Sequence, residues 1–379
     1  MSILAGVNGI VPEIAAEVIR TASREKPADA ALREVLKSLR RLPPFDAAAV
    51  SRAVFTYYRW LGWTREERGV PARIRQAERL AERFKDRPES FPATELRAAA
   101  VPDWTAAEME ISINWLRSLQ REPKLWLRSR RGKTISLTAM PGCVAGPLAE
   151  AFLYEGEADL FRTPAFHAGD FEIQDITSQA VGWLCAPKPG ETWWDACAGE
   201  GGKTLHLSGL MENKGLIWAS DRAAWRLQRL KRRAARAGVF NYRAAAWDGG
   251  ARLPTKTKFD GVLIDAPCSG IGTWQRNPHA RWTTTPNDVA ELSAVQMRLL
   301  EHAAVAVKPG GKLIYAVCTL TRAETVAVAD FVGNRFNAFE PLPVPSPLQP
   351  GSTPAARLWL WPQDTGGNGM FVAVWRKKG

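Results

Sequence analysis

Short apolar runs alternate with longer amphipathic segments between residues 191 and 318. The short runs are typical of strands that are buried on both faces of a parallel sheet, and the amphipathic segments predict the helices that connect them. The predicted strands are Thr192 to Cys197, Gly215 to Asp221, Tyr242 to Asp248, Phe259 to Ala266 and Lys312 to Cys318. The clearest helices are Arg222 to Ala237 and Asp288 to Val307. This alternation predicts an α/β fold with a doubly wound parallel sheet.

The chain before this region has a different pattern. Residues 1–102 are rich in Ala, Arg, Leu and Glu with apolar residues at helical spacing, which predicts a helical N-terminal domain. Residues 103–170 begin with a helix that carries Trp115 and continue into Leu125 to Arg128 and Thr134 to Thr138, which we predict to be short strands. We therefore expect a small α+β module there, followed by a third domain at residues 171–379.

A glycine-rich turn, Ala198-Gly199-Glu200-Gly201-Gly202-Lys203, follows the first predicted strand. Small residues at the start of a helix let the backbone approach a ligand closely. The spacing of a Walker phosphate loop is absent, because Gly199 lies too close to Gly202 and Lys203, and ATP is therefore disfavoured. The G-x-G-x-x-G spacing of dinucleotide-binding folds is absent as well, which disfavours a nicotinamide-dependent oxidoreductase.

Two acidic residues end the next two predicted strands. Asp221 follows the glycine turn by about 20 residues, a position from which a carboxylate can accept hydrogen bonds from both hydroxyls of a ribose, and Asp248 ends the third strand. This arrangement suits the adenosine half of S-adenosylmethionine. Both acids can equally be helix caps, and the spacing alone leaves the two interpretations open.

Two cysteines follow apolar runs that predict buried strands. Cys268 lies in Asp265-Ala266-Pro267-Cys268-Ser269-Gly270, and Cys318 lies in Tyr315-Ala316-Val317-Cys318-Thr319-Leu320. Parallel strands place such residues at the carboxyl edge of the sheet, where open α/β folds bind their ligands. One cysteine at a strand end is most simply a small core residue, but two in matching contexts indicate covalent catalysis. Core positions are the preferred interpretation for Cys143, Cys185 and Cys197.

These segments together resemble the RsmB, Nop and Sun family of RNA cytosine-5 methyltransferases. The resemblance covers roughly Phe171 to Lys377 and follows the family's order of motifs. The motifs are Phe171 to Gln179, the glycine turn with Lys203 and Thr204, Pro267-Cys268-Ser269-Gly270, Arg276-Asn277-Pro278, Gln296, Lys308-Pro309-Gly310-Gly311 and Tyr315 to Leu320. The resemblance implies a Rossmann-like class I methyltransferase domain at residues 171–379 that uses S-adenosyl-L-methionine. One departure is Glu200, which stands where members commonly have proline.

The resemblance also implies a role for each candidate catalytic residue. Cys318 matches the cysteine that adds to carbon 6 of cytosine, so that carbon 5 can attack the methyl group, and Cys268 matches the cysteine that helps release the product. Asp265 matches the acid at ring nitrogen 3, and Lys203 matches a lysine near the thiols or the substrate. The residues expected to contact the methyl donor are Ala198, Gly199, Glu200, Gly201, Gly202, Lys203, Asp221, Arg226, Asp248 and Asp265.

The charge of the chain favours a polyanionic partner, because the formal net charge is +12. The basic segment from Arg128 to Lys133 is the preferred RNA candidate, in which Trp126 either stacks on a base or is buried. The helix from Arg226 to Arg236 is also basic, but its cations surround the helix, which is typical of a solvated face. Ribosomal RNA is preferred to transfer RNA, because the N-terminal helices are weakly similar to an RNA-binding domain of bacterial members. The alternative to an enzyme is a catalytically silent, RNA-binding ribosome-assembly factor.

The remaining features concern metal binding and compartment. The four histidines do not cluster with cysteine at metal-ligand spacing, so no metal site is expected. Five cysteines in 379 residues form no disulfide framework, and a thiol mechanism needs a reducing compartment. With no signal peptide and no apolar run of about 18 residues, we expect a cytoplasmic protein without membrane contact, and a monomer.

Overall fold

The computed structural model describes residues 4–39 and 43–379, which form two compact units. The first unit comprises residues 1–123 together with 273–286, and the second comprises residues 124–272 together with 287–379. The segment 273–286 thus packs with the N-terminal helices, although it lies within the range expected for the catalytic domain. The domain boundaries expected after residues 102 and 170 stay predictions.

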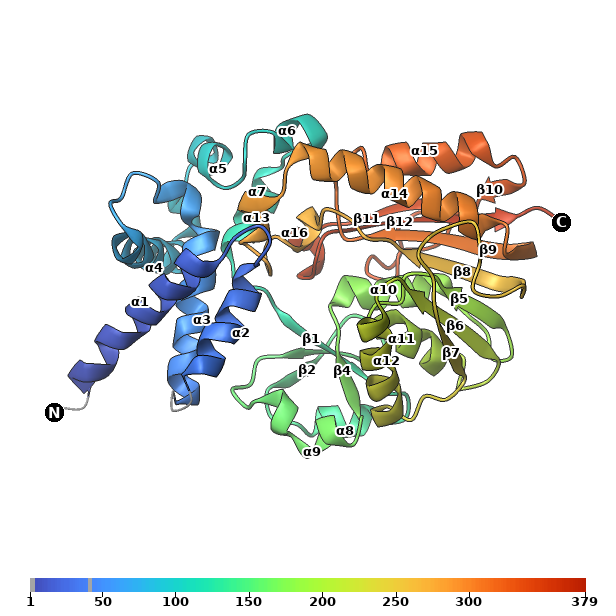
Figure 1. Ribbon diagram of the computed structural model, residues 1–379, viewed down its shortest axis with the longest axis horizontal. Coiled ribbons are helices and arrows are strands. Elements are labelled where there is room, and N and C mark those ends of the chain that lie inside the picture. The colour runs from blue at the N-terminus through green and yellow to red at the C-terminus, as the bar shows by residue number, and fades with distance from the viewer. Residues whose placement is uncertain (1–3, 40–42) are drawn as a thin grey trace. The chain divides into compact units, whose positions relative to one another are not determined.

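The first unit is built from helices (Figure 1). They are α1 (Leu4–Thr21), α2 (Ala28–Ser38), α3 (Pro44–Arg59), α4 (Val70–Asp86), α5 (Ala93–Ala99), α6 (Thr105–Glu108), α7 (Ile113–Gln120) and the later α13 (Ala280–Thr283). Apolar residues at helical spacing on α1 to α4 form one buried cluster that includes Val18, Val35, Val54, Tyr57 and Ile74. The helical pattern of the sequence is therefore confirmed, because these residues provide the buried face of each helix.

Arg281 on α13 joins the late segment to the N-terminal helices of the same unit. Its side chain is fully buried, and its guanidinium donates to the carbonyls of Arg59 (3.2 Å), Ala100 (3.0 Å), Leu119 (3.0 Å) and Trp274 (3.4 Å). Burial lowers the pKa of Arg281 to about 9, so the group stays protonated at neutral pH. One side chain therefore satisfies carbonyls at the ends of three helices, which otherwise lack partners.

The second unit contains two sheets (Figure 1). A small antiparallel sheet has the order β2 (Cys143–Ala145), β3 (Ala151–Tyr154), β1 (Leu125–Ser129), β4 (Phe171–Ile173). The large sheet has the order β10-β12-β9-β8-β5-β6-β7, with β11 beside β12. Its strands are β5 (Thr192–Asp195), β6 (Leu216–Asp221), β7 (Tyr242–Ala246), β8 (Phe259–Asp265), β9 (Val307–Val317), β10 (Phe339–Pro341), β11 (Arg357–Leu360) and β12 (Met370–Lys377).

Strands β5 to β9 are parallel, as the sequence predicted, and β10, β11 and β12 add an antiparallel edge. The chain runs from β5 outward through β6 and β7, and then returns to the other side of β5 at β8. The order therefore reverses between β5 and β8, which is the switch point where doubly wound sheets bind their ligands.

Helices cover both faces of the large sheet (Figure 1). On one face, α14 (Pro286–Ala304) and α15 (Val326–Arg335) pack on Leu313 and Tyr315 of β9. On the other, α10 (Ile176–Cys185) and α11 (Gly202–Leu210) pack on Ile314 and Ala316, while α12 (Ala224–Arg236) covers β6 and β7. Successive residues of a strand point to opposite faces, so a continuous apolar run is what this doubly covered strand requires.

One element of the small module was predicted incorrectly. Thr134–Thr138 forms a short helix, α8, and not a strand. Threonine and isoleucine favour strands by their branched side chains, but the Thr138 hydroxyl donates to the Thr134 carbonyl at 3.1 Å within this single turn. The other short elements of the unit are α9 (Pro164–His167) and α16 (Pro362–Thr365).

We predict that Arg281→Met lowers the free energy of unfolding by at least about 2 kcal/mol, because four carbonyls lose their donor while the stem still fills the space. Urea unfolding followed by tryptophan fluorescence measures the change, with Arg68→Met on an exposed position of the same unit as the control. Equal stability of the two variants would contradict the role given to Arg281.

Candidate active site

The candidate catalytic residues meet at the carboxyl ends of β5, β8 and β9. Asp265 is the last residue of β8, Cys268 follows it by one short loop, and Cys318 comes directly after β9. Lys203 reaches the same edge from the first turn of α11, which follows β5. Because these three strands are adjacent, four residues that are up to 115 positions apart in the sequence form one site at the switch point.

The two cysteines face each other. Their sulfur atoms are 3.3 Å apart, and both side chains are free thiols of intermediate exposure. The hydrogen bond to Cys318, together with burial, raises the pKa of Cys268 well above its ordinary range. Cys268 therefore keeps its proton at neutral pH and can donate it toward the Cys318 sulfur.

Glu324 holds together the loops that carry the two cysteines. Its fully buried carboxylate accepts hydrogen bonds from the Ser269 amide (2.8 Å) and the Ser269 hydroxyl on one loop. On the other loop it accepts from the hydroxyls of Thr319 (3.1 Å) and Thr321 (3.0 Å). Sequence analysis missed Glu324, although its place three residues after Thr321 matches a capping box, which is a signal for a structured turn.

A second buried network anchors Glu324 to the helix on that face of the sheet. The Gln296 amide of α14 donates to the Glu324 carboxylate (3.0 Å) and to the Pro267 carbonyl (2.9 Å). The Tyr315 hydroxyl of β9 lies 2.8 Å from Gln296 Oε1 and 2.6 Å from the Glu324 carbonyl, and these two acceptors share its single proton. Gln296 was singled out only as part of the resemblance, and its contacts now give it a structural role.

Lys203 and Asp265 form an ion pair beside the thiols. Lys203 Nζ lies 2.6 Å from Asp265 Oδ2, and the lysine side chain is only 8% exposed. Burial disfavours the ammonium, but the Asp265 carboxylate and the sulfur of Cys318 favour it, and the net effect raises the pKa of Lys203. A fixed positive charge therefore stands next to the cysteine pair.

Asp195, at the end of β5, is a buried acid that sequence analysis did not select. Its side chain is fully buried, Oδ2 accepts a hydrogen bond from the Thr204 hydroxyl at 2.6 Å, and Oδ1 has no partner among the described residues. Burial raises the pKa of Asp195 to about 7. A carboxylate inside an apolar strand was the signal that could have identified it.

The glycine turn and Asp221 form a cradle at the ends of β5 and β6. The buried Asp221 carboxylate accepts hydrogen bonds from the amides of Gly199 (3.0 Å) and Ala223 (2.8 Å), and Arg226 lies 3.8 Å from it. Gly199 and Gly201 have positive φ angles of 55° and 88°. A Cβ added at Gly199 would meet nothing within 4 Å, so the space above the turn is open to a ligand.

The other residues that were predicted to bind the methyl donor differ in their positions and in their partners. Ala198 and Gly202 belong to the same turn, but the Glu200 carboxylate points to Arg229 at 2.6 Å. Asp248 lies two residues beyond the end of β7, is exposed, and accepts a hydrogen bond from the Gly250 amide at 2.8 Å. No helix follows Asp248 directly among the described residues, so this local bond closes a turn and is not the helix cap that the sequence left open.

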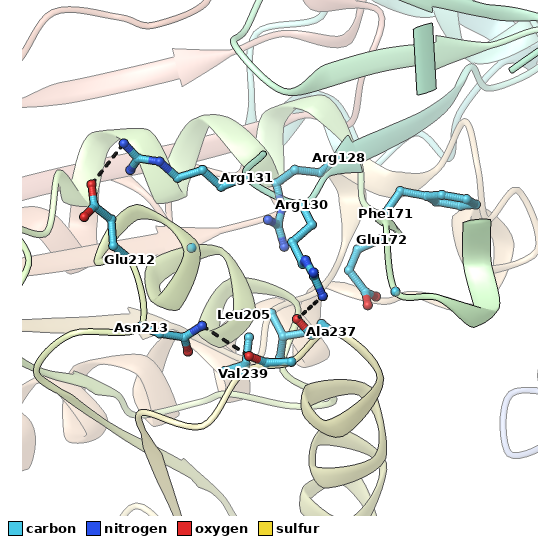
Figure 2. Close-up of a pocket in the computed structure, with 13 residues that line it drawn as sticks. Arg128, Arg130, Arg131, Phe171, Glu172, Leu205, Glu212, Asn213, Ala237 and Val239 are labelled. Atoms are coloured by element: carbon cyan, nitrogen blue, oxygen red, sulfur yellow. Dashed lines mark hydrogen bonds and ion pairs between the residues drawn. The ribbon is translucent and has the colours of Figure 1, made fainter. Parts of the chain in front are cut away.

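The Arg128 segment joins the small sheet to the helices of the large one (Figure 2). Arg128 is 5% exposed and donates to Gln174 at 2.6 Å, Arg130 donates to the Ala237 carbonyl at 3.1 Å, and Arg131 pairs with Glu212 at 3.1 Å. The three arginines line a cavity of about 360 Å³ at the carboxyl ends of α11 and α12. Cations are stabilised at such helix ends, which gives these arginines a structural role.

Trp126 in the same segment is buried. Its ring is 5% exposed, and its indole nitrogen donates to the Gly366 carbonyl at 2.9 Å. Of the two interpretations offered for this residue, the structure supports burial, because a ring enclosed in this way cannot stack on a base.

Neither a membrane-spanning helix nor a metal-binding group of side chains occurs within residues 4–39 and 43–379. No helix there is long and apolar enough to cross a membrane. No group of three or more His, Cys, Asp or Glu side chains in these ranges is arranged to hold a metal ion.

Comparison with known proteins identifies the family. A family model described as 16S rRNA methyltransferase RsmB/F matches residues 182–376, which is more than half of the chain. The chain belongs to this family. The matched range contains the glycine turn, the Lys203–Asp265 pair and both cysteines, so the family assignment and the candidate site rest on the same segment.

Two curated relatives agree with the RsmB/F assignment. The chain is 38% identical to "Probable ribosomal RNA small subunit methyltransferase B" of Synechocystis sp. over 57% of its own length and 50% of that protein. It is 31% identical to ribosomal RNA small subunit methyltransferase B of Pasteurella multocida, over 73% of its length and 65% of that protein. The chain thus spans about half to two thirds of the length of these relatives.

A crystal structure of the protein PH0851 covers 98% of both chains with a TM-score of 0.76 at 23% identity. The likeness extends over the helical region, the small sheet and the large sheet. The fold is therefore that of a Rossmann-like class I methyltransferase domain preceded by a small α+β module and N-terminal helices, as expected from the sequence.

We predict that Asp195→Asn becomes more stable relative to the wild type as pH rises. Because burial favours the protonated acid, the contribution of Asp195 to folding is full below about pH 4 and is lost as pH rises through about 7. Between pH 5 and pH 8 the difference in unfolding free energy should change by about 2 kcal/mol, measured by urea denaturation. A difference that is constant with pH would refute the raised pKa.

We also predict that Glu324→Ala lowers the free energy of unfolding by about 3–5 kcal/mol, because its buried donors lose a charged acceptor. Glu324→Gln should cost less, since the threonine hydroxyls can rotate and accept from the new amide. The exposed Glu291→Ala on α14 is the control, and thermal unfolding gives the order of the three variants. A Glu324→Ala variant as stable as Glu291→Ala would show that the network is not needed.

Proposed function

We propose that the protein is an S-adenosyl-L-methionine-dependent RNA cytosine-5 methyltransferase whose catalytic domain spans residues 171–379. The observation that carries this proposal is the pair of facing thiols, 3.3 Å apart, at the switch point of a methyltransferase fold. Methyl transfer to most acceptors needs no cysteine. Transfer to carbon 5 of a pyrimidine can use two, one that adds to carbon 6 and one that assists release of the product. The Lys203–Asp265 pair beside them supports the same chemistry.

The cradle at β5 and β6 suits the methyl donor. Asp221 is placed to bind the ribose hydroxyls, with the turn from Ala198 to Gly202 providing backbone groups and open space. Bound there, S-adenosyl-L-methionine supplies an electrophilic methyl group. Arg226, beside Asp221, belongs to the same proposed set, whereas Glu200 and Asp248 have local partners and contribute mainly to the shape of their loops.

Cys318 is the proposed nucleophile. Carbon 5 of cytosine is a weak nucleophile, so the Cys318 thiolate adds to carbon 6, and the electron pair of the 5,6 double bond becomes available at carbon 5. The Lys203 ammonium stabilises the negative charge that this addition delivers to the ring, and Asp265 is placed to hold the polar edge at nitrogen 3. After carbon 5 has gained the methyl group, the sulfur–carbon 6 bond must break.

Cys268 is proposed to assist that release. Its pKa is raised by the hydrogen bond to Cys318 and by burial, so it is a thiol during the addition and stands next to the sulfur that must leave. Solvent water takes the carbon 5 proton, the electron pair of that carbon–hydrogen bond restores the 5,6 double bond, and the electron pair of the sulfur–carbon 6 bond returns to Cys318 as thiolate. A neighbouring thiol can hydrogen-bond to this developing thiolate and favour its departure.

The proposed substrate is ribosomal RNA in preference to transfer RNA. Relatives that match the chain are named ribosomal RNA small subunit methyltransferases B and F, and the formal net charge of +12 suits a polyanion. Because two free thiols must stay reduced, we propose a cytoplasmic protein. We also propose that it acts as a monomer, since every candidate residue comes from one unit of one chain.

Two cysteine variants test the mechanism. Incubated with 16S rRNA and tritiated methyl donor, Cys318→Ala should lose methylation by at least about a thousandfold while it keeps its fold, because no other group can add to carbon 6. Cys268→Ala should accumulate a protein–RNA adduct that survives denaturing electrophoresis, because release is slowed. Cys143→Ala, on β2 of the small sheet and outside the candidate site, is the control.

Three results would contradict these roles. Near-normal turnover by Cys318→Ala would show that Cys318 is not the nucleophile. An adduct formed by Cys318→Ala instead of Cys268→Ala would show that the two cysteines have exchanged roles. RNA binding without methylation by the wild-type protein would favour the silent assembly factor.

A further inference from the structure

A groove runs along the outer side of α12 in the second unit. It has a volume of about 510 Å³. Its lining residues are Phe161, Phe166, Glu172, Ile173, Glu200, Arg229, Arg232, Arg233 and Arg236. The arginines come from the basic helix that sequence analysis interpreted as a solvated face, and the aromatic residues come from the small module.

The arginines of this groove differ in how far they are neutralised. Arg233 and Arg236 both bind Glu172 and are 25% and 20% exposed, so they mainly join α12 to β4. Arg229 pairs with Glu200 but is 53% exposed. Arg232 is exposed, and none of the described carboxylates pairs with it. Four arginines against two acids leave the groove positively charged.

Aromatic rings accompany these cations. Phe161, in the short 3-10 helix Leu160–Arg162, is 59% exposed, and its ring packs edge-on against the Phe166 ring, with the ring centres 5.0 Å apart. The guanidinium of Arg236 lies 3.8 Å from the centre of the Phe166 ring. At the first turn of α12, Trp225 is 54% exposed, with the guanidinium of Arg229 at 4.8 Å. Exposed rings beside arginines are typical of surfaces that bind single-stranded nucleic acid.

The groove begins at the proposed donor site. Glu200 lines it and belongs to the glycine turn, and Arg233 donates to the Glu200 carbonyl at 3.0 Å. The turn that cradles the donor is therefore also one end of a basic, aromatic channel. A strand whose target base enters the site can continue directly into this channel.

We propose that the α12 groove binds the single-stranded RNA segment next to the target cytosine. Arg232 and Arg229 contact phosphates, and Phe161 stacks on a base. This inference rests on the proposed function for the identity of the strand. It moves the RNA contact from the Arg128 segment, whose arginines all have protein partners, to the basic helix, where Arg232 is exposed and none of the described carboxylates pairs with it. An acidic protein would use the arginines but has no need of the exposed ring, whereas an anionic membrane surface could use both and is separated by the vesicle measurement below.

Neighbouring positions on α12 provide a matched test. Lys231 is exposed and does not line the groove, whereas Arg232 does. The probe is a fluorescein-labelled 12-nucleotide single-stranded RNA of mixed sequence, and fluorescence anisotropy measures Kd from about 0.05 to 0.3 M salt. Arg232→Ala should weaken binding about threefold or more and lower the slope of log Kd against log salt by about 0.7. Phe161→Ala should weaken binding about tenfold with an unchanged slope, and Lys231→Ala should change neither by more than about twofold.

The outcomes separate this inference from the proposed function. If the cations of α12 only form a solvated face, Arg232→Ala and Lys231→Ala should have the same RNA affinity, and this result would overturn the proposal. RNA affinity unchanged by Phe161→Ala would overturn it as well. If Arg232→Ala lost binding to vesicles that contain phosphatidylserine but kept its binding to RNA, the groove would be assigned to a membrane and the proposal would be overturned. Because the probe needs neither the methyl donor nor turnover, absence of methylation by the wild-type protein would refute the enzyme while the RNA measurement still decides the groove.

Discussion

The cysteine pair depends on one buried carboxylate. Strands β8 and β9 run side by side to Asp265 and Val317, and beyond them the regular ladder gives way to two loops that share one backbone bond, from the Gly272 amide to the Cys318 carbonyl (3.0 Å). Glu324 supplies what the ladder no longer does, because it accepts hydrogen bonds from Ser269 on one loop and from Thr319 on the other. Leaving such a carboxylate or its donors unpaired in the interior is costly, so the loops have one favourable arrangement. That arrangement brings two thiols to 3.3 Å.

The cost of an unpaired charge in the interior also determines the arrangement of the rest of the site. Lys203 is almost fully buried and can carry its charge there only because Asp265 lies 2.6 Å away. Asp195, close by and without a cation of its own, responds to burial with a pKa of about 7. The carboxyl edge thus combines one fixed ion pair, one acid that titrates near neutral pH and two facing thiols. A site with these properties can hold charge in place while bonds to sulfur form and break.

The sequence was sufficient for the large sheet and insufficient for the contacts that position the site. Continuous apolar runs predicted strands β5 to β9 to within a few residues, because a strand covered by helices on both faces needs apolar side chains in every direction. Thr134–Thr138 was assigned to the wrong element because branched side chains predict strands only where a partner strand exists. The roles of Glu324 and Arg281 were out of reach, since their partners lie on loops and helix ends that no periodicity brings together. The basic character of α12 was evident, but which of its cations face aromatic rings from the small module depends on tertiary packing.

The central claim is that this RsmB/F-family protein methylates carbon 5 of a cytosine in ribosomal RNA. Bisulfite sequencing of total RNA from cells that lack the protein, compared with their parent, tests it most directly, because methylated cytosines resist conversion. We expect one cytosine in the 16S rRNA to lose protection, and we expect that the gene restored with Cys318→Ala does not recover it. Unchanged protection at every cytosine, or recovery with the Cys318→Ala gene, would contradict the account.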